Sequence, residues 1–435
     1  TTEIYTLSLH DALPIYLILL FLLFNMLTGV NIESSPDDEL LKIFSDMEEY
    51  NLRTYPEGAT YNGDHRYDDR LSDNSEAAVF KYYDTLRAYM NRLKLVDYNN
   101  LSESDKLNYD LFKSSLEENL AGEKFKGYYM PMGQQWGIHI YAPQLINYQP
   151  VSTYEEYKKY FSRLRQLESK FDNTISNMRK GISEGYVMPV FLMDQTLPQI
   201  EKIIAENPEQ SVFYSTLKKE NKLTPEEKSL VENELKEIIV KVINPSYKKL
   251  YDFVKTEYLP ACRTDAGVWA LPNGKELYEY SIKSYTTLDL TADEIHNIGL
   301  SEVARIYAEM EKVKDLTGFK GSLQEFNEFL KSDPQFYYTE KEDLMNGYRE
   351  ILKKMDEKLP ELFGILPEAK YDLFEMEEYR AASAPQAYYY SAPDDRSRPG
   401  YFYVNTYNLP SRPKYTMTAL ALHEAVPGHH LQIAI

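Results

Sequence analysis

The sequence has very little cysteine and lacks the common phosphate-binding motifs. Cys262 is the single cysteine among 435 residues, which excludes an internal disulfide and any metal or redox site of the CxxC type. No GxxxxGK[ST] or GxGxxG motif occurs. A P-loop and a dinucleotide-binding turn are therefore excluded as well.

Positive charge is also scarce. The 48 lysines and arginines face 68 aspartates and glutamates, which gives a formal net charge of -20. Such a surface repels phosphates, so we expect no nucleic-acid partner. A hydrophobic content of 43% is ordinary for a globular protein. The length exceeds what one core usually supports, which predicts a large two-lobed domain or two domains.

The N-terminal segment divides into three parts. Residues 1–15 begin without Met and resemble a translated sequencing adapter, so we interpret them as an artefact. Residues 16–30 form an apolar run of signal-peptide length, too short for a comfortable membrane span; a buried core helix is the alternative. Residues 31–37 have linker composition. Val30 stands where a lipoprotein signal needs cysteine, which leaves lipid anchoring open. We expect an exported, extracellular or cell-surface protein whose membrane contact is limited to this segment.

From residue 38 to residue 435 the patterns predict a mainly α-helical domain. Ser or Thr followed three residues later by Glu marks helix starts at Ser152, Thr224, Thr291, Ser322 and Thr339. Apolar residues then recur at helical spacing, as at Leu230, Leu235, Ile238, Ile239 and Val242. Three stretches break this pattern. Residues 128–150 predict a long loop or short strands, residues 265–275 predict a loop that ends in a turn, and residues 387–406 predict a β-hairpin just before the C-terminal motif.

The chemistry of the chain is concentrated in that motif, which contains His423, Glu424, His429 and His430. Zinc peptidases place two histidine ligands and a catalytic Glu on one helix, with the second His four residues after the first. Here that position holds Pro427. His65, His139 and His296 are isolated, and we interpret them as packed or surface residues.

A straight helix would not bring a later histidine back to His423. Six residues on lies roughly 240° round the axis, and seven lies about 10 Å along it. Pro427 cannot donate to the carbonyl of His423, so a kink or bulge at Pro427-Gly428 is expected. Such a break could return His429 or His430 to His423. The alternative is a helix end whose imidazoles interact with the last carbonyls.

The run Ala-Leu-His-Glu-Ala-Val-Pro-Gly-His-His, with the preceding residues 401–415, resembles the signature of the bacterial DUF885 family. Residues 56–60 and 63–73 resemble the N-terminal motif of that family. The resemblance implies a large helical fold, two-lobed with a cleft, similar to thermolysin-clan carboxypeptidases. It also implies a zinc-dependent peptidase for short peptides, and it favours His429 over His430 as the second ligand.

On this hypothesis His423 and His429 hold Zn²⁺ and Glu424 is the general base. Tyr401, Tyr403 and Asn405 alternate along the second hairpin strand and are candidates for lining a substrate cleft; the alternative is an aromatic face packed on the motif helix. Arg412 is a candidate for a substrate carboxylate.

A zinc hydrolase needs a third protein ligand, which in similar peptidases is a Glu beyond the motif. The sequence ends at Ile435, so we expect this ligand beyond it, with weak zinc binding and no activity in the chain as written. Glu377 and Glu378 are poor substitutes. The competing interpretation is a non-catalytic exported protein that binds peptides or another ligand. Exo- or endopeptidase specificity and oligomeric state are left open.

Overall fold

The computed structural model describes residues 38–376, 381–382, 384–393 and 396–435. The predicted artefact, signal-like segment and linker, together with Glu377 and Glu378, lie outside these residues. The chain separates into two compact units, the first ending at Leu290 and the second beginning at Thr291. The described part is mainly helical with one small sheet, which confirms the predicted fold class.

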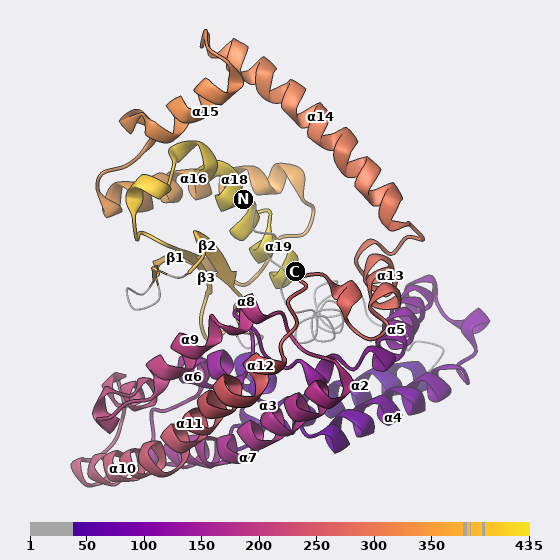
Figure 1. Ribbon diagram of the computed structural model, residues 1–435, viewed down its shortest axis with the longest axis vertical. Helices are drawn as coiled ribbons and strands as arrows, with labels where there is room; N and C mark the ends of the chain where they lie inside the picture. The colour runs from indigo at the N-terminus through magenta and orange to yellow at the C-terminus, as the bar shows by residue number, and fades with distance from the viewer. Residues whose placement is uncertain (1–37, 377–380, 383, 394–395) are drawn as a thin grey trace. The chain divides into compact units, whose positions relative to one another are not determined.

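In the first unit, helix follows helix along the chain (Figure 1). The α-helices are α2 Asp38–Thr54, α3 Pro56–Tyr61, α4 Glu76–Leu93, α5 Glu103–Gly122, α6 Ile138–Tyr148, α7 Tyr154–Glu184, α8 Val190–Met193, α9 Thr196–Ile203, α10 Pro225–Ile238, α11 Asn244–Phe253, α12 Leu259–Ala261 and α13 Gly274–Thr286. Short 3₁₀ turns lie at η1 His65–Tyr67, η2 Tyr98–Asn100, η3 Glu123–Phe125, η4 Gly127–Tyr129, η5 Pro208–Gln210, η6 Val212–Lys218 and η9 Val268–Ala270.

The segment from α10 to α12 contains two wider, π-helical turns. They are η7 Ile239–Ile243 and η8 Val254–Tyr258. Each lies just before a proline, Pro245 or Pro260, which lacks the N–H that an α-helix needs and whose ring collides with the preceding turn. The widened turns let the helical direction continue past both prolines.

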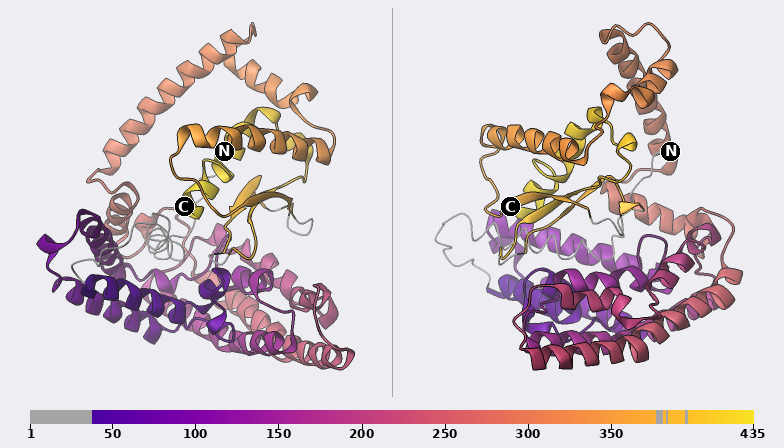
Figure 2. Two further views of the ribbon diagram at one scale, coloured as in Figure 1. Left: turned by 180° about the vertical axis from the view of Figure 1, so that it is seen from behind. Right: turned by 90° about the vertical axis from the view of Figure 1, so that its left-hand side faces the viewer.

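The core of the first unit is centred on α7. Its buried Leu164 and Phe171 belong to one hydrophobic cluster with residues of α6, α9, α10 and α11, and Phe171 packs against Tyr247 with ring centroids 4.8 Å apart. The helices α7, α10 and α11 lie side by side in all three ribbon views (Figures 1 and 2). A separate cluster joins α2, α4 and α5.

A buried arginine of α7 holds the loop that follows α3. Arg163 is 0% exposed, and its guanidinium donates at 2.5–3.2 Å to the side-chain oxygens of Thr60 and Gln149 and to three backbone carbonyls. Those carbonyls belong to Pro56, Tyr67 and Arg70. A buried charge needs this many partners to offset its lost hydration.

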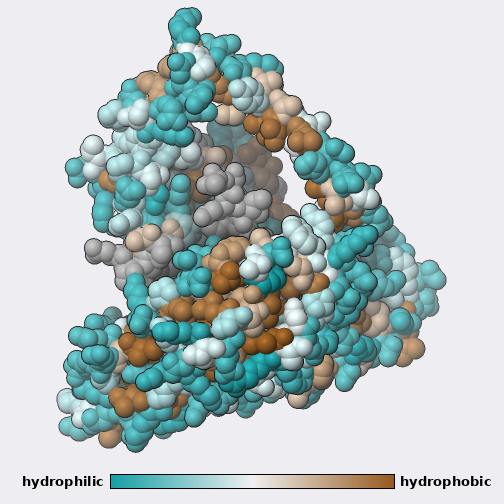
Figure 3. Space-filling model, viewed as in Figure 1, coloured by the Kyte–Doolittle hydropathy of each residue, from teal (hydrophilic) through white to brown (hydrophobic). Residues whose placement is uncertain are grey.

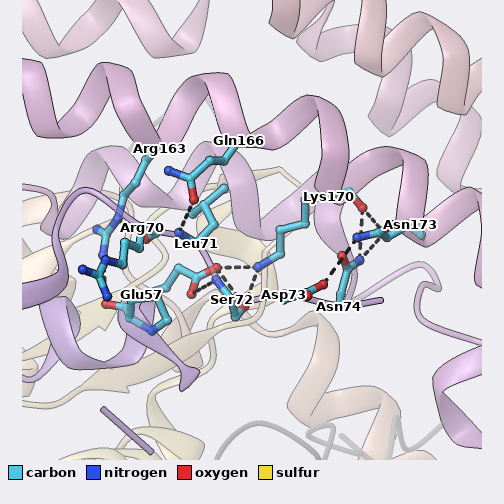
Figure 4. A network of polar contacts seen from close by, with 12 residues as sticks. Glu57, Arg70, Leu71, Ser72, Asp73, Asn74, Arg163, Gln166, Lys170 and Asn173 are labelled. Carbon is cyan, nitrogen blue, oxygen red and sulfur yellow. Dashed lines mark hydrogen bonds and ion pairs between the residues drawn. The ribbon is translucent and has the colours of Figure 1, made fainter. Parts of the chain in front are cut away.

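A second contact set ties the same loop to α7 (Figure 4). Lys170 Nζ lies 2.5 Å from Glu57 Oε1 and 2.6 Å from Ser72 Oγ, and the Ser72 N–H donates to Glu57 at 2.9 Å. His65 also lies in this loop, with Nδ1 3.1 Å from the buried carboxylate of Asp68. The N-terminal motif residues thus fasten a loop to the longest helix of the unit.

Most predicted helix starts are confirmed. Thr224, Thr291 and Ser322 each form a full capping box with the Glu three residues later. The prediction at Ser152 is wrong by one residue, because Thr153 caps α7 together with Glu156. The prediction at Thr339 is also wrong: Glu340 is the N-cap of α16, and its side chain makes no capping hydrogen bond.

The predicted loop or strands at 128–150 are likewise wrong, since α6 occupies 138–148 with Pro143 inside it. The aromatic and proline content of this stretch hid its helical period. His139 is buried in α6, with Nε2 3.2 Å from Gln199 Oε1, as expected for a packed histidine.

The second unit places a small sheet against helices. Its elements are α14 Ala292–Leu316, α15 Leu323–Ser332, η10 Pro334–Phe336, α16 Lys341–Leu362, β1 Tyr371–Glu375, β2 Ala387–Tyr390, β3 Gly400–Val404, η11 Leu409–Ser411, α18 Lys414–Glu424 and α19 His429–Ala434. The predicted hairpin is confirmed as the antiparallel pair β2 and β3. The strand β1, which the sequence patterns did not indicate, pairs in parallel on the other side of β3, so the sheet order is β1-β3-β2.

One face of the sheet carries the motif helix. Phe402 and Val404 of β3 share a buried cluster with Met417 and Ala421 of α18 and with Tyr348 of α16. The helices α16 and α18 pack on each other, and α18 also packs on β2. The core of the second unit therefore fixes the C-terminal end of α18 beside the sheet.

The long helix α14 carries exposed hydrophobic residues, visible along it in Figure 3. Ile298, Val303, Ile306, Met310 and Val313 follow one another at three- to five-residue spacing, and all are exposed. Such spacing is typical of a helix face that packs on other protein. No helix in the described part of the chain is long and apolar enough to cross a membrane.

Candidate metal centre

The motif forms a break between two helices rather than one kinked helix. His423 and Glu424 are the last residues of α18, and His429 is the first residue of α19. Residues 425–428 make the turn between them, with Pro427 following a cis peptide bond. The predicted break at Pro427-Gly428 is confirmed, because Pro427 has no N–H with which to continue the ladder of α18.

Gly428 lets the chain fold back tightly on α18. A Cβ atom at this position would lie 1.9 Å from the carbonyl oxygen of His423 and 2.4 Å from that of Leu422. Both are backbone atoms that cannot swing away. Only glycine permits this close approach, which starts α19 directly beside the end of α18.

The turn brings together three side chains of the types that can hold a metal ion. One ligand atom each from His423, Glu424 and His429 lie within 4.8 Å of one another. The two imidazole centroids are 4.7 Å apart, and His429 Nε2 lies 3.9 Å from Glu424 Oε2. Donors around a tetrahedral zinc are roughly 3.3 Å apart, so small side-chain rotations suffice to close the group on an ion. Two imidazoles and a carboxylate are a donor set that suits zinc.

Burial favours the uncharged forms of Glu424 and His429. Glu424 is 7% exposed, and burial raises its pKa, partly offset by His423 and by the backbone N–H of Tyr389. Burial, with a smaller effect of His423, lowers the pKa of His429. His429 therefore stays neutral, with a lone pair for a metal, to lower pH than an ordinary histidine. His423, in contrast, is exposed to solvent.

His430 is held away from this group. It is 2% exposed, and its Nδ1 lies 2.8 Å from the hydroxyl of Tyr389. Its ring also packs against Tyr371 at a centroid distance of 4.7 Å. Burial lowers the pKa of His430 to about 4. Of the two neighbouring histidines, the fold thus turns His429 toward His423 and His430 into the protein.

Tyr401 and Tyr403 lie on the other face of the sheet. Side chains alternate along a strand, and their neighbours Phe402 and Val404 face α18. Instead, the tyrosines stack on other sheet aromatics: Tyr403 on Tyr388 with centroids 4.9 Å apart, and Tyr401 on Tyr390 at 6.3 Å. The alternative that these two rings pack on the motif helix is therefore wrong, whereas their candidate role in lining a substrate cleft stays a prediction.

Asn405 does not share a cleft-lining face with the tyrosines. It is 0% exposed, and its amide donates to the carbonyls of Ala381 and Pro385 at 2.7 and 3.0 Å. Its own oxygen accepts from the N–H of Tyr407 at 2.9 Å. The strand ends at Val404, so the period-two alternation no longer applies at Asn405. Its contacts are those of a residue that fixes a turn.

Arg412 lies close enough to Tyr348 for its charge to act on the hydroxyl of that tyrosine. Its Nε donates to the carbonyl of Asn405 at 3.0 Å, and one terminal nitrogen donates to Ser411 Oγ at 2.7 Å. Burial raises the pKa of Tyr348 to about 12; the charge of Arg412 opposes this rise and the charge of Glu424 adds to it. Both charges are therefore close enough to act on one hydroxyl.

Sequence reasoning did not single out Tyr389. It lies on β2, at the edge of the sheet. Its N–H donates to Glu424 of the group, and its hydroxyl bonds to the neighbouring His430. Its sequence signal, a run of three tyrosines, indicated a strand and nothing more. Among the residues that the structure describes, this group has three members, and no further His, Cys, Asp or Glu joins it.

The protein therefore has a mainly helical fold with a His-Glu-His group at a break between two helices. The chain belongs to the DUF885 family, described as a bacterial protein of unknown function, which matches residues 56–435. The family resemblance of the sequence motifs is thereby confirmed. Among curated proteins, none matches the chain.

Solved structures of other proteins share the fold. One is described as a "putative lipoprotein" from Colwellia psychrerythraea, with a TM-score of 0.84 and 22% identity over 91% of this chain and 72% of that one. Another, described as a "putative lipoprotein of unknown function" from Shewanella oneidensis, has a TM-score of 0.61 and 16% identity over 90% of this chain and 70% of that one. At these identities the likeness shows the fold alone.

Proposed function

We propose that the protein is a zinc-dependent peptidase that hydrolyses short peptides in a carboxypeptidase-like manner. The observation that carries the proposal is the convergence of His423, Glu424 and His429 within 4.8 Å across a helix break. His423 and His429 are the proposed zinc ligands. A bound zinc ion supplies Lewis acidity toward a carbonyl and lowers the pKa of a water. In this proposal the third protein ligand comes from outside the described residues.

Glu424 is the proposed general base. Its carboxylate is next to both histidines and is partly withdrawn from water. Because burial raises its pKa, this carboxylate is a better proton acceptor than an exposed Glu. It takes a proton from the attacking water and returns it to the departing amine. The N–H of Tyr389 orients the carboxylate for this transfer.

In this proposal the backbone of the substrate pairs with the edge strand β2. Asn405 N donates to Gln386 O at 2.9 Å, so pairs 386/405, 388/403 and 390/401 are hydrogen-bonded pairs. The backbone groups of Ala387 and Tyr389 then face the outer side of β2, where Glu424 lies. An extended peptide placed along this edge would bring its carbonyl to the base.

Arg412 is the proposed partner of the free carboxylate of the substrate. Its charge acts on Tyr348 together with that of Glu424, and a guanidinium binds a carboxylate with two parallel hydrogen bonds. This assignment is the part of the proposal that makes the enzyme act at a chain end.

We also propose that the protein is exported. The apolar run at 16–30 and the description of both structural neighbours as lipoproteins support this. The proposal is tested by locating the native protein in cell fractions: recovery from the medium, the periplasm or the cell surface supports export, and recovery from the cytoplasm contradicts it.

The test of the peptidase is cleavage of a mixed peptide library by the complete gene product, with and without a zinc chelator. Glu424→Gln should keep its zinc and lose at least about 10²-fold in kcat. The matched control is Glu302→Gln on the exposed face of α14, which should cleave like the wild type. If the intact protein holds no zinc and cuts nothing, the alternative of a non-catalytic binding protein gains support, and ligands should be screened instead.

A further inference from the structure

The second histidine of the His-His pair has a role of its own. We propose that His430 is a positioning residue, which holds Tyr389 and thereby sets the orientation of Glu424 and the start of α19. The inference rests on the proposed peptidase function. It assigns to the buried His430 a task distinct from binding the metal.

The hydrogen bonds of His430 fix which nitrogen carries the hydrogen. One ring nitrogen donates to the backbone carbonyl of Ala369, and a carbonyl can only accept. Nδ1 is then the acceptor of the neutral ring, so the hydroxyl of Tyr389, 2.8 Å away, is the donor. Both nitrogens are thus used within the protein, in a side chain that is 2% exposed.

Tyr389 connects this buried bond to the reacting group. Its side chain lies on the sheet face that also carries Phe402, its cross-strand partner, and α18 packs against β2. Its N–H faces the outer edge of the strand and donates to Glu424. A displacement of the Tyr389 ring would therefore move the N–H that orients the carboxylate.

The neighbouring strand leaves room for this arrangement. A Cβ atom at Gly400 would lie 2.1 Å from the hydroxyl oxygen of Tyr389. Glycine at the start of β3 thus allows the hydroxyl to reach His430. On the other side, the N–H of His430 donates to the carbonyl of Ala425 at 2.9 Å. His430 therefore contacts β2 through its side chain and closes the turn before His429 through its backbone N–H.

The experiment compares Tyr389→Phe and His430→Gln with the complete wild-type protein. Tyr389→Phe removes one hydroxyl and keeps the ring and the N–H. Each change should lower kcat about 10- to 100-fold while KM stays within about twofold and zinc stays near one per chain, since partners that orient a site residue are worth that much. The double variant should lose no more than either single variant, because both remove the same hydrogen bond.

The matched control is Tyr388→Phe on the opposite face of the same strand, which should leave kcat unchanged. A measurement independent of activity is the ¹⁵N spectrum of His430 in the metal-free protein. It should show hydrogen on Nε2 and an acceptor Nδ1, and the Nδ1 signal should shift in Tyr389→Phe.

The outcomes separate the two proposals. An active wild type whose Tyr389→Phe variant behaves like Tyr388→Phe, or whose double variant loses the product of both single losses, overturns the positioning role and leaves the peptidase intact. A wild type without zinc or cleavage overturns both.

Discussion

Replacing Gly428 by Ala tests whether the tight turn creates the metal centre. The added Cβ would lie 1.9 Å from the His423 carbonyl oxygen, whereas Cβ atoms essentially never approach other heavy atoms within 3.0 Å. The turn must therefore open by about 1 Å, a shift that typically costs about 10²-fold at a site whose geometry matters. Overpacking of this kind also destabilises a fold by about 1–3 kcal/mol.

Zinc affinity and urea unfolding of the complete gene product measure the two effects. Gly428→Ala should weaken zinc binding by about 10²-fold and lower the free energy of unfolding by about 2 kcal/mol. The control is Gly299→Ala in α14, where a Cβ meets no atom within 4 Å; it should stabilise the helix by up to about 1 kcal/mol. If Gly428→Ala binds zinc and unfolds like the wild type, the close approach does not shape the site.

Three further variants test other parts of the account. Arg163→Met leaves buried acceptors without their donor, so urea unfolding should show a free energy of unfolding that is about 3–5 kcal/mol lower. An unchanged urea midpoint would contradict the role of Arg163 in holding the loop that follows α3. Burial lowers the pKa of His139 to about 4. The unfolded chain therefore binds a proton first, and stability should fall by about 3 kcal/mol from pH 6.5 toward 4; this slope should flatten in His139→Gln. Arg412→Gln should raise KM about tenfold for peptides with a free carboxylate and leave amidated peptides unaffected; equal effects on both would exclude the assigned contact.

The sequence was informative where one residue decides the local structure. Pro427 cannot extend the hydrogen-bond ladder of α18, so the break could be predicted without coordinates. The three confirmed capping boxes follow from equally local chemistry. At Thr153 two overlapping patterns differ by one residue, and the sequence alone does not say which hydroxyl is the cap.

The sequence was uninformative where distant residues meet. Tyr389 reaches His430 only because β2 pairs with β3 in one register and Gly400 leaves space. The orientation of His429 and His430 likewise depends on the dihedral angles of the turn, which helix periodicity does not supply. Asn405 shows the same limit, since alternation stops where the strand ends at Val404.

The zinc content of the complete gene product, measured by elemental analysis, tests the central claim most directly. The wild type should carry about one zinc per chain, His429→Ala should carry almost none, and His430→Gln should keep its zinc. A wild type without zinc, or a His430→Gln variant that loses zinc while His429→Ala retains it, would contradict the assignment of His423 and His429 as the metal ligands.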